Sequence, residues 1–328
     1  MRVTRRLKQF ALAAAMLWAG CGAAFGQSSA SYPNKPVRVV ITFPPGGSTD
    51  VIPRIVAQKL IERWGQPWVF DNRPGAGGQI AVGAVLKASA DGYTLLVGPS
   101  GAIAMNPSLY KKLAYDPVRD LAPIVPLART PMVLLVPVTW PGTVKDLIEQ
   151  SRSKQGQLNY GHGGSGTGMH LTGEMFKMAT GADLTPVPFK TSGDVITTLS
   201  GGQLHAGWVD SNFALIGLKG GRVRAIAVSA RERSPMLPEV PTVAESGFRG
   251  FDAMGWFGFF APAGTPADII GRLNAEVRAT LAMPEVRERI LATGNEPWWS
   301  TAEEFGAFVR TEIAKWARVV KESGASAD

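Results

Sequence analysis

The sequence predicts an α/β fold of two lobes, each with a mostly parallel sheet flanked by helices, and a cleft between the lobes. Runs rich in β-branched residues alternate with segments whose apolar residues recur at helical spacing, as in parallel sheets. A glycine-rich loop between a strand and a helix occurs in the first half of the chain and again in the second half. About 300 residues are also more than one hydrophobic core usually serves, which favours two lobes.

The first 26 residues have the pattern of a secretory signal peptide. Four basic residues precede an apolar stretch over residues 10–19, and a small-x-small cleavage site ends at Gly26. Because this stretch is too short for a good transmembrane span, we expect an exported protein without a membrane anchor. Two other interpretations stay open: Arg5 and Arg6 resemble the start of a twin-arginine signal, and Cys21 lies in an imperfect lipoprotein box.

Composition excludes several classes of site. Cleavage after Gly26 removes the only cysteine, so we expect neither disulfides nor a cysteine nucleophile. Cleavage also lowers the formal net charge from +8 to +4, which is too mild for a nucleic-acid-binding protein and suits an acidic small molecule. The three histidines have no cysteine or close carboxylate pattern around them, so we expect no metal site and no cofactor.

The first half contains three strand-to-loop units. Strand 37–41 leads into the loop FPPGGSTD (residues 43–50) and a helix over residues 51–64, and strand 68–70 leads into the loop 71–78 and a helix over residues 79–88. Strand 93–97 leads into the small-residue loop 99–102. A glycine-rich turn at a helix N-terminus offers backbone amides to an anion, although an ordinary capped turn has the same composition. All three loops belong at the carboxyl edge of a parallel sheet, where ligands bind.

The second half repeats this arrangement after an irregular stretch over residues 106–126. We expect strands at residues 133–136 and 158–160 with a capped helix, residues 143–154, between them. The loop GHGGSGTG (residues 161–168) then opens a helix over residues 169–180. Further strands are expected at residues 185–189, 206–209 and 225–228, and a helix at residues 194–200.

The tail begins with an aromatic strand over residues 251–260 and continues with helices at residues 268–282, 285–292 and 301–322. Because it has no further glycine-rich loop after a strand, we expect it to cover the first lobe. The chain would then cross between the lobes near residues 129 and 252, as in hinged proteins. The predicted division is a signal peptide (1–26), a first lobe (27–128 with 253–328) and a second lobe (129–252).

The loop 161–168 partly matches two enzymatic motifs. Its glycines at 161, 163 and 166 match the dinucleotide fingerprint, but no acidic residue ends a clear second strand about 20 positions on. A nucleophile elbow around Ser165 fails because Thr167 stands where glycine is required. A secreted serine hydrolase using Ser165 remains an alternative function.

Six motifs spread over the chain resemble the Bug family, the periplasmic solute receptors of tripartite tricarboxylate transporters. This resemblance implies a non-enzymatic, monomeric periplasmic receptor with two lobes of the type II binding-protein kind. It implies a small carboxylate bound through backbone amides, hydroxyls and water, and delivery to membrane permease subunits; a sensor subunit for signalling is an alternative. The motifs are YPxKP (32–36), FxPGGSTD (43–50), NRPGAGG (72–78), DGYTL (91–95), GSGT with His170-Leu171 (164–171) and APAGTP (261–266).

The resemblance also implies which residues bind the ligand. One carboxylate would be held from the first lobe and the other end of the ligand from the second. Where the family often has PYKG this chain has PFKT (residues 188–191), and the bulk of Trp208 suggests a flat or aromatic acid. The implied residues of the first lobe are Phe43, Gly47, Ser48, Thr49, Asn72, Ser100 and Ala102. Those of the second lobe are Gly164, Ser165, Thr167, His170, Lys190, Trp208 and Asp210.

Overall fold

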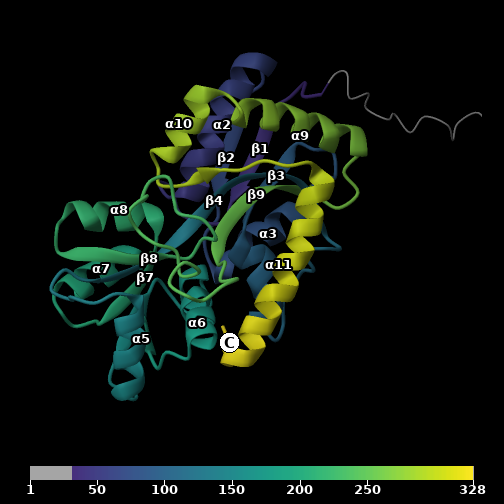
Figure 1. Ribbon diagram of the computed structural model, residues 1–328. Helices are drawn as coiled ribbons and strands as arrows, with labels where there is room; N and C mark the ends of the chain where they lie inside the picture. The colour runs from purple at the N-terminus through teal and green to yellow at the C-terminus, as the bar shows by residue number, and fades with distance from the viewer. Residues whose placement is uncertain (1–31, 328) are drawn as a thin grey trace, which may run out of the picture.

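The computed structural model describes residues 32–327, so the predicted signal peptide, residues 1–26, lies outside the described range. The described chain forms a mixed α/β fold in which one curled, ten-stranded sheet is flanked by helices (Figure 1). The strand order is β2-β1-β3-β9-β4-β7-β5-β6, and β8 and β10 also pair with β4. The predicted α/β class is confirmed.

The first section of the sheet contains three parallel strands. β1 (Val37–Ile41) lies between β2 (Trp68–Asn72) and β3 (Thr94–Pro99). Most side chains of β1 are fully buried, as expected of a central strand covered on both faces. The helical segments that follow these strands are α2 (Ser48–Trp64), η2 (Ala76–Gly78), α3 (Gln79–Leu86), η3 (Gly101–Met105) and α4 (Asn106–Leu109).

The longest strand, β4 (Leu121–Pro137), runs through both sections of the sheet. Its first part pairs antiparallel with β9 (Met254–Pro262) and β10 (Glu296–Pro297), and its second part with β7 (Ala206–Asp210) and β8 (Val223–Val228). The sequence predicted irregular structure up to residue 126 because of its prolines. Shifts in register after Pro123 and Pro126 accommodate them within the strand.

The second section repeats the parallel arrangement. β5 (Asn159–His162) lies between β6 (Thr185–Pro188) and β7, and all three run parallel. The outer strands of both sections are thus parallel, as predicted, whereas the strands around β4 are antiparallel. The helices of this section are α5 (Val144–Ser153), α6 (Gly168–Thr180), α7 (Ser192–Ser200) and α8 (Ser211–Lys219).

The tail forms α9 (Ala267–Leu281), α10 (Pro284–Leu291) and α11 (Ala302–Ser323). α9 and α10 pack with α2 over the first section, whereas α11, yellow in Figure 1, contacts η3 and β4 and ends beside α6. Beyond α11, the amide of Ala327 donates to the carbonyl of Leu109 (3.2 Å). A Cβ on Gly166 would lie 3.6 Å from the Cβ of Ala327, so the chain end also reaches the second section.

The register places the carboxyl ends of the two sets of parallel strands opposite each other. At the end of β3, Pro99 pairs with Phe257, which pairs with Ala128 of β4. At the end of β7, Asp210 pairs with Met132 of β4. β3 runs in the same direction as β4, whereas β7 runs in the opposite direction. The carboxyl ends of β3 and β7 therefore face each other along β4, about four residues apart, which is ~13 Å at 3.3 Å per residue. The loops that follow these strands therefore converge on the middle of β4.

Candidate functional site

The first turn, residues 43–49, presents a row of unused hydrogen-bond donors. Among the described residues, the backbone amides of Gly47, Ser48 and Thr49 and the hydroxyl of Thr49 donate to no partner. α2 begins at Ser48, so these amides are the orphan donors of its N-terminus. Three consecutive free amides at the positive end of a 17-residue helix form a favourable position for an anion.

Asp50 fixes the shape of the first turn. It is 4% exposed; Oδ2 accepts the Gly46 amide (3.0 Å), and Oδ1 accepts Arg54 (2.8 Å) and Asn72 (3.1 Å). Burial by itself raises the pKa of this carboxyl, but the hydrogen bonds outweigh burial and hold the pKa below its usual value. In the sequence, Asp50 and Arg54 have only the i, i+4 spacing of a helix surface pair, which does not indicate that Asp50 supports the turn.

The other predicted ligand-binding residues of the first section are Asn72, Phe43, Ser100 and Ala102. Asn72 also donates to the carbonyl of Phe43 (2.9 Å), so its amide group holds the turn. The Phe43 side chain is 48% exposed. Ser100 and Ala102 are buried, and the carbonyl of Ala102 accepts the hydroxyl of Tyr115 (2.5 Å).

A hydrogen-bonded link joins the first turn to the segment after α10. Asn295 is fully buried and donates to the hydroxyl of Ser48 (2.8 Å). Its side-chain oxygen accepts the hydroxyl of Thr130 on β4 (2.6 Å). Ser48 can still donate its own proton, because this bond uses only an acceptor position.

The second turn, residues 163–167, is fixed around one carbonyl. Gly164 O accepts the amide and the hydroxyl of Thr167 (3.3 and 2.7 Å) and lies 3.0 Å from His162 Nδ1. Because a carbonyl only accepts, His162 carries its proton on Nδ1. The Thr167 hydroxyl also caps α6 by accepting the His170 amide. The predicted ligand contact at Thr167 is therefore occupied within the turn.

The free donors of the second turn lie on other atoms. The amide of Gly164 and both the amide and hydroxyl of Ser165 donate to no partner among the described residues, and Ser165 is exposed. The amides of Gly168 and Met169, the first residues of α6, are free as well. Like the first turn, this loop offers several amides and one hydroxyl at a helix N-terminus.

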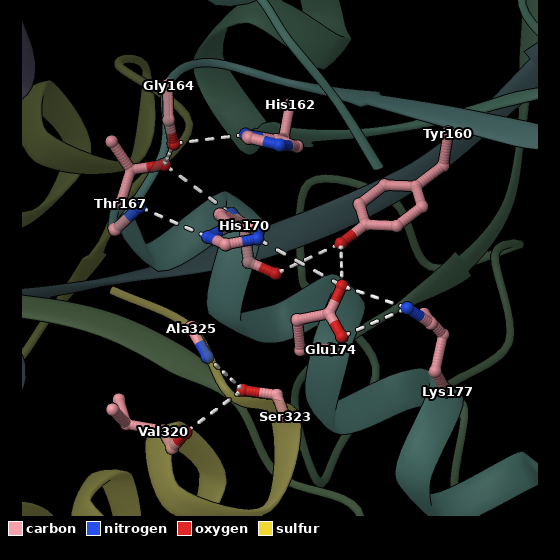
Figure 2. A network of polar contacts seen from close by, with 11 residues as sticks. Tyr160, His162, Gly164, Thr167, His170, Glu174, Lys177, Val320, Ser323 and Ala325 are labelled. Atoms are coloured by element: carbon pink, nitrogen blue, oxygen red, sulfur yellow. Dashed lines mark hydrogen bonds and ion pairs between the residues drawn. The ribbon is translucent and has the colours of Figure 1, made fainter. Parts of the chain in front are cut away.

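His170 is committed to the structure of the turn (Figure 2). Its Nδ1 accepts the Gly166 amide (3.1 Å), and its ring stacks on His162 with centroids 4.4 Å apart. Its Nε2 lies 4.0 Å from Glu174, which accepts the hydroxyl of Tyr160 (2.8 Å). Burial lowers the pKa of His170 and lowers that of His162 to about 4, so both rings are neutral at pH 7.

The other predicted residues of the second section are Trp208, Asp210 and Lys190. Trp208 is fully buried between Phe176 and Phe251, so it is a core residue and gives no basis for an aromatic ligand. Asp210 accepts the hydroxyl of Ser192 (3.0 Å), and burial raises its pKa. Lys190 is exposed on the loop after β6.

A pocket of about 330 Å³ lies between the first turn and α8 of the second section. Residues of the first turn and the start of α2 line one side, and a face of α8 lines the other. None of residues 163–167 lines it. Its lining comprises Gly46, Ser48, Val51, Asn212, Leu215, Ile216, Lys219, Met236, Ala292 and Thr293.

Two kinds of feature are absent from the described residues. Residues 32–327 contain no group of three or more His, Cys, Asp or Glu side chains that could hold a metal ion. Within the same range, no helix is long and apolar enough to cross a membrane.

The sequence profile of one protein family, described as "Tripartite tricarboxylate transporter family receptor", matches residues 52–325. The chain belongs to this family. The match confirms the resemblance found in the sequence and shows that the protein is a receptor of this kind.

Relatives of the receptor support the assignment over nearly its whole length. Protein BugT of Bordetella pertussis (strain Tohama I) is 37% identical over 309 residues, covering 94% of this chain and 95% of BugT. A structure titled "R. palustris Rpa4515 with adipate" is 36% identical with a TM-score of 0.80, covering 90% of this chain and 99% of the other. "MatC (Rpa3494) from Rhodopseudomonas palustris with bound malate" is 33% identical with a TM-score of 0.76, covering 88% of this chain and all of the other.

Proposed function

We propose that this receptor captures a small organic carboxylate in the periplasm and delivers it, as a monomer, to the membrane permease subunits of a tripartite tricarboxylate transporter. The ligand lies between a first lobe, residues 27–128 with 253–328, and a second lobe, residues 129–252. The observation that carries the proposal is the pair of turns with free amides, at Gly47 to Thr49 and at Gly164 to Ser165.

The chemistry of the free donors favours a carboxylate. Each turn adds a hydroxyl, from Thr49 or Ser165, to amides at the positive end of a helix. The two sets of strand ends point towards each other, so a ligand with an anionic group at each end could contact both turns. The related structures with adipate and with bound malate support a dicarboxylate.

The same arrangement disfavours the hydrolase that the sequence left open. A serine nucleophile needs a base within hydrogen-bond reach. Among the described residues, Ser165 has no hydrogen bond to a histidine, and His170 Nδ1 is occupied by the Gly166 amide. Receptor function without catalysis is therefore proposed.

A binding screen tests the ligand class. Adipate, L-malate, a tricarboxylate and benzoate are titrated calorimetrically into the mature protein, with adipamide as the uncharged match to adipate. We expect one of the acids to bind with micromolar affinity and to raise the melting temperature. Failure of every carboxylate would rule out the proposed ligand class. Steady hydrolysis of an activated ester that is lost in Ser165→Ala would instead favour the enzyme.

A further inference from the structure

The second turn depends on a neutral imidazole lone pair. His170 Nδ1 is the acceptor for the Gly166 amide, and Thr167 and His162 fix the neighbouring Gly164 carbonyl. We propose that His170 is a positioning residue, which holds the second turn in its anion-binding shape by accepting the Gly166 amide hydrogen and releases it when Nδ1 is protonated. The inference rests on the proposed function, because it takes this turn to bind the carboxylate.

The surroundings of His170 determine which tautomer it adopts. Because Nδ1 accepts a hydrogen bond, the ring proton is on Nε2, on the side of Glu174. The titratable groups that face the ring are Glu174 and Lys177 on α6 and Tyr160 and His162 on β5. The chain end packed on Gly166 contributes the uncharged Ala327.

Protonation affects the two stacked histidines differently. A second proton on His170 would sit on Nδ1 and point at the Gly166 N–H, so the hydrogen bond would be replaced by a clash of two donors. His162 already donates from Nδ1 to Gly164 O and keeps that bond in either state. Acid therefore acts on the turn through His170.

Burial and Lys177 lower the pKa of His170, and Glu174 opposes them in part. The ring is neutral at pH 7 and takes up its proton only below the ordinary value of about 6.5. The binding-competent turn is thus stable at neutral pH and is lost as the pH falls through the lowered pKa.

Two substitutions separate positioning from simple structural support. His170→Asn keeps an oxygen acceptor near the position of Nδ1 but cannot be protonated, whereas His170→Ala removes the acceptor. His205→Asn is the control, because His205 is a histidine in a different part of the second section, where its Nδ1 lies 2.9 Å from the side-chain oxygen and 3.3 Å from the backbone nitrogen of Asn159. Adipate affinity is measured by calorimetry between pH 7.5 and pH 5.0 for all four proteins. Ligand protonation cancels because affinities are compared at each pH.

At pH 7.5 we expect His170→Ala to lose about tenfold in adipate affinity and His170→Asn to stay within about threefold of wild type. As the pH is lowered below 6.5, the affinity of wild type relative to His170→Asn should fall, and His205→Asn should follow wild type. Equal pH profiles for wild type and His170→Asn, or wild-type affinity in His170→Ala, would overturn the proposal.

A measurement without ligand tests the positioning role of His170 independently of the proposed carboxylate ligand. Hydrogen exchange by NMR should show the Gly166 amide protected in wild type and His170→Asn and about tenfold less protected in His170→Ala. Protection in wild type should fall as the pH is lowered below 6.5. If Gly166 behaves in this way but adipate does not bind, the ligand assignment fails and the positioning role stands. If Gly166 is equally protected in all variants, the positioning role fails.

Discussion

The first and second turns are each held by a side-chain acceptor for a glycine amide, but the acceptor residue differs. In each, a side chain in the first turns of the helix accepts the amide of a glycine four residues earlier: Asp50 accepts from Gly46, and His170 accepts from Gly166. The first acceptor is a carboxylate with a lowered pKa, and the second is a neutral imidazole with a lowered pKa. The first turn should therefore resist acid that disrupts the second, so the two halves of one site differ in their response to pH.

The largest effect is expected from removing the carboxylate of the first turn. Asp50→Ala leaves Arg54, Asn72 and the Gly46 amide without their acceptor, so the free energy of unfolding should fall by about 2–3 kcal/mol. Adipate affinity should fall by about thirtyfold or more. Denaturant unfolding and calorimetry measure the two effects.

Asp71→Ala is the control for this prediction, because Asp71 is likewise an arginine-paired carboxylate, with Arg38 and Arg73, but accepts no hydrogen bond from the first turn among the described residues. It should lower stability by at most about 1 kcal/mol and leave affinity unchanged. Equal losses of affinity in both variants would show that Asp50 has no special role at the turn.

The second effect is the acid response of the second turn. Both His162 and His170 have lowered pKa values, so the folded state binds fewer protons than the unfolded state between about pH 6.5 and pH 4. Their contribution to stability is complete above pH 6.5 and is lost as the pH falls through this window. Asp50 keeps its contribution there, because its lowered pKa confines its loss to more acidic solutions.

The double variant His162→Asn, His170→Asn isolates this contribution from that of the carboxyls. Relative to it, wild type should lose about 2 kcal/mol or more of unfolding free energy between pH 7 and pH 4.5. Urea unfolding at intervals of half a pH unit measures the difference. Parallel curves for the two proteins would contradict the prediction.

A pair of glycine substitutions gives the next effect. Gly166 has a φ of +74°, and a Cβ there would lie 3.2 Å from Leu109 Cδ1, so Gly166→Ala should cost about 1–2 kcal/mol. Gly47 has a φ of −81° and nothing within 4 Å of a Cβ. Gly47→Ala should therefore change stability by less than about 0.5 kcal/mol. Thermal unfolding of both variants gives the comparison, and equal losses would show that Gly166 is not constrained.

The smallest effect distinguishes the two threonines. Thr167→Val removes a helix cap and a donor to Gly164 O, so stability should fall by about 1 kcal/mol. Thr49→Val removes a hydroxyl without a partner among the described residues, so stability should stay within about 0.5 kcal/mol while adipate affinity falls about threefold to tenfold. A loss of stability in Thr49→Val and a loss of adipate affinity alone in Thr167→Val would contradict this prediction.

The sequence could predict where the turns lie but not which of their atoms are free. Glycine and small hydroxyl residues between a strand and a helix were enough to place both turns. Thr49 and Thr167 look alike in the sequence, however. Only the course of the backbone decides that the Thr167 hydroxyl donates to Gly164 O while the Thr49 hydroxyl has no hydrogen-bond partner within residues 32–327. The four-residue spacing from Gly46 to Asp50 and from Gly166 to His170 was the available signal for the supporting side chains.

Other limits of prediction arise from tertiary packing. Trp208 stands two residues before the end of β7 and resembles a site residue in sequence, but the register of β7 directs it into the core with Phe176 and Phe251. Asn295 lies about 250 residues from Ser48, so no local pattern could connect them. The prolines of β4 suggested a loop because register shifts cannot be read from composition.

Ala327 is hydrogen-bonded to Leu109 and lies next to Gly166, which affects the design of C-terminal fusions of this receptor. A purification tag or fluorescent reporter fused close behind Ala327 would begin near the second turn, where it would compete for space with a bound carboxylate. Binding data from such fusions should be compared with those from the untagged protein.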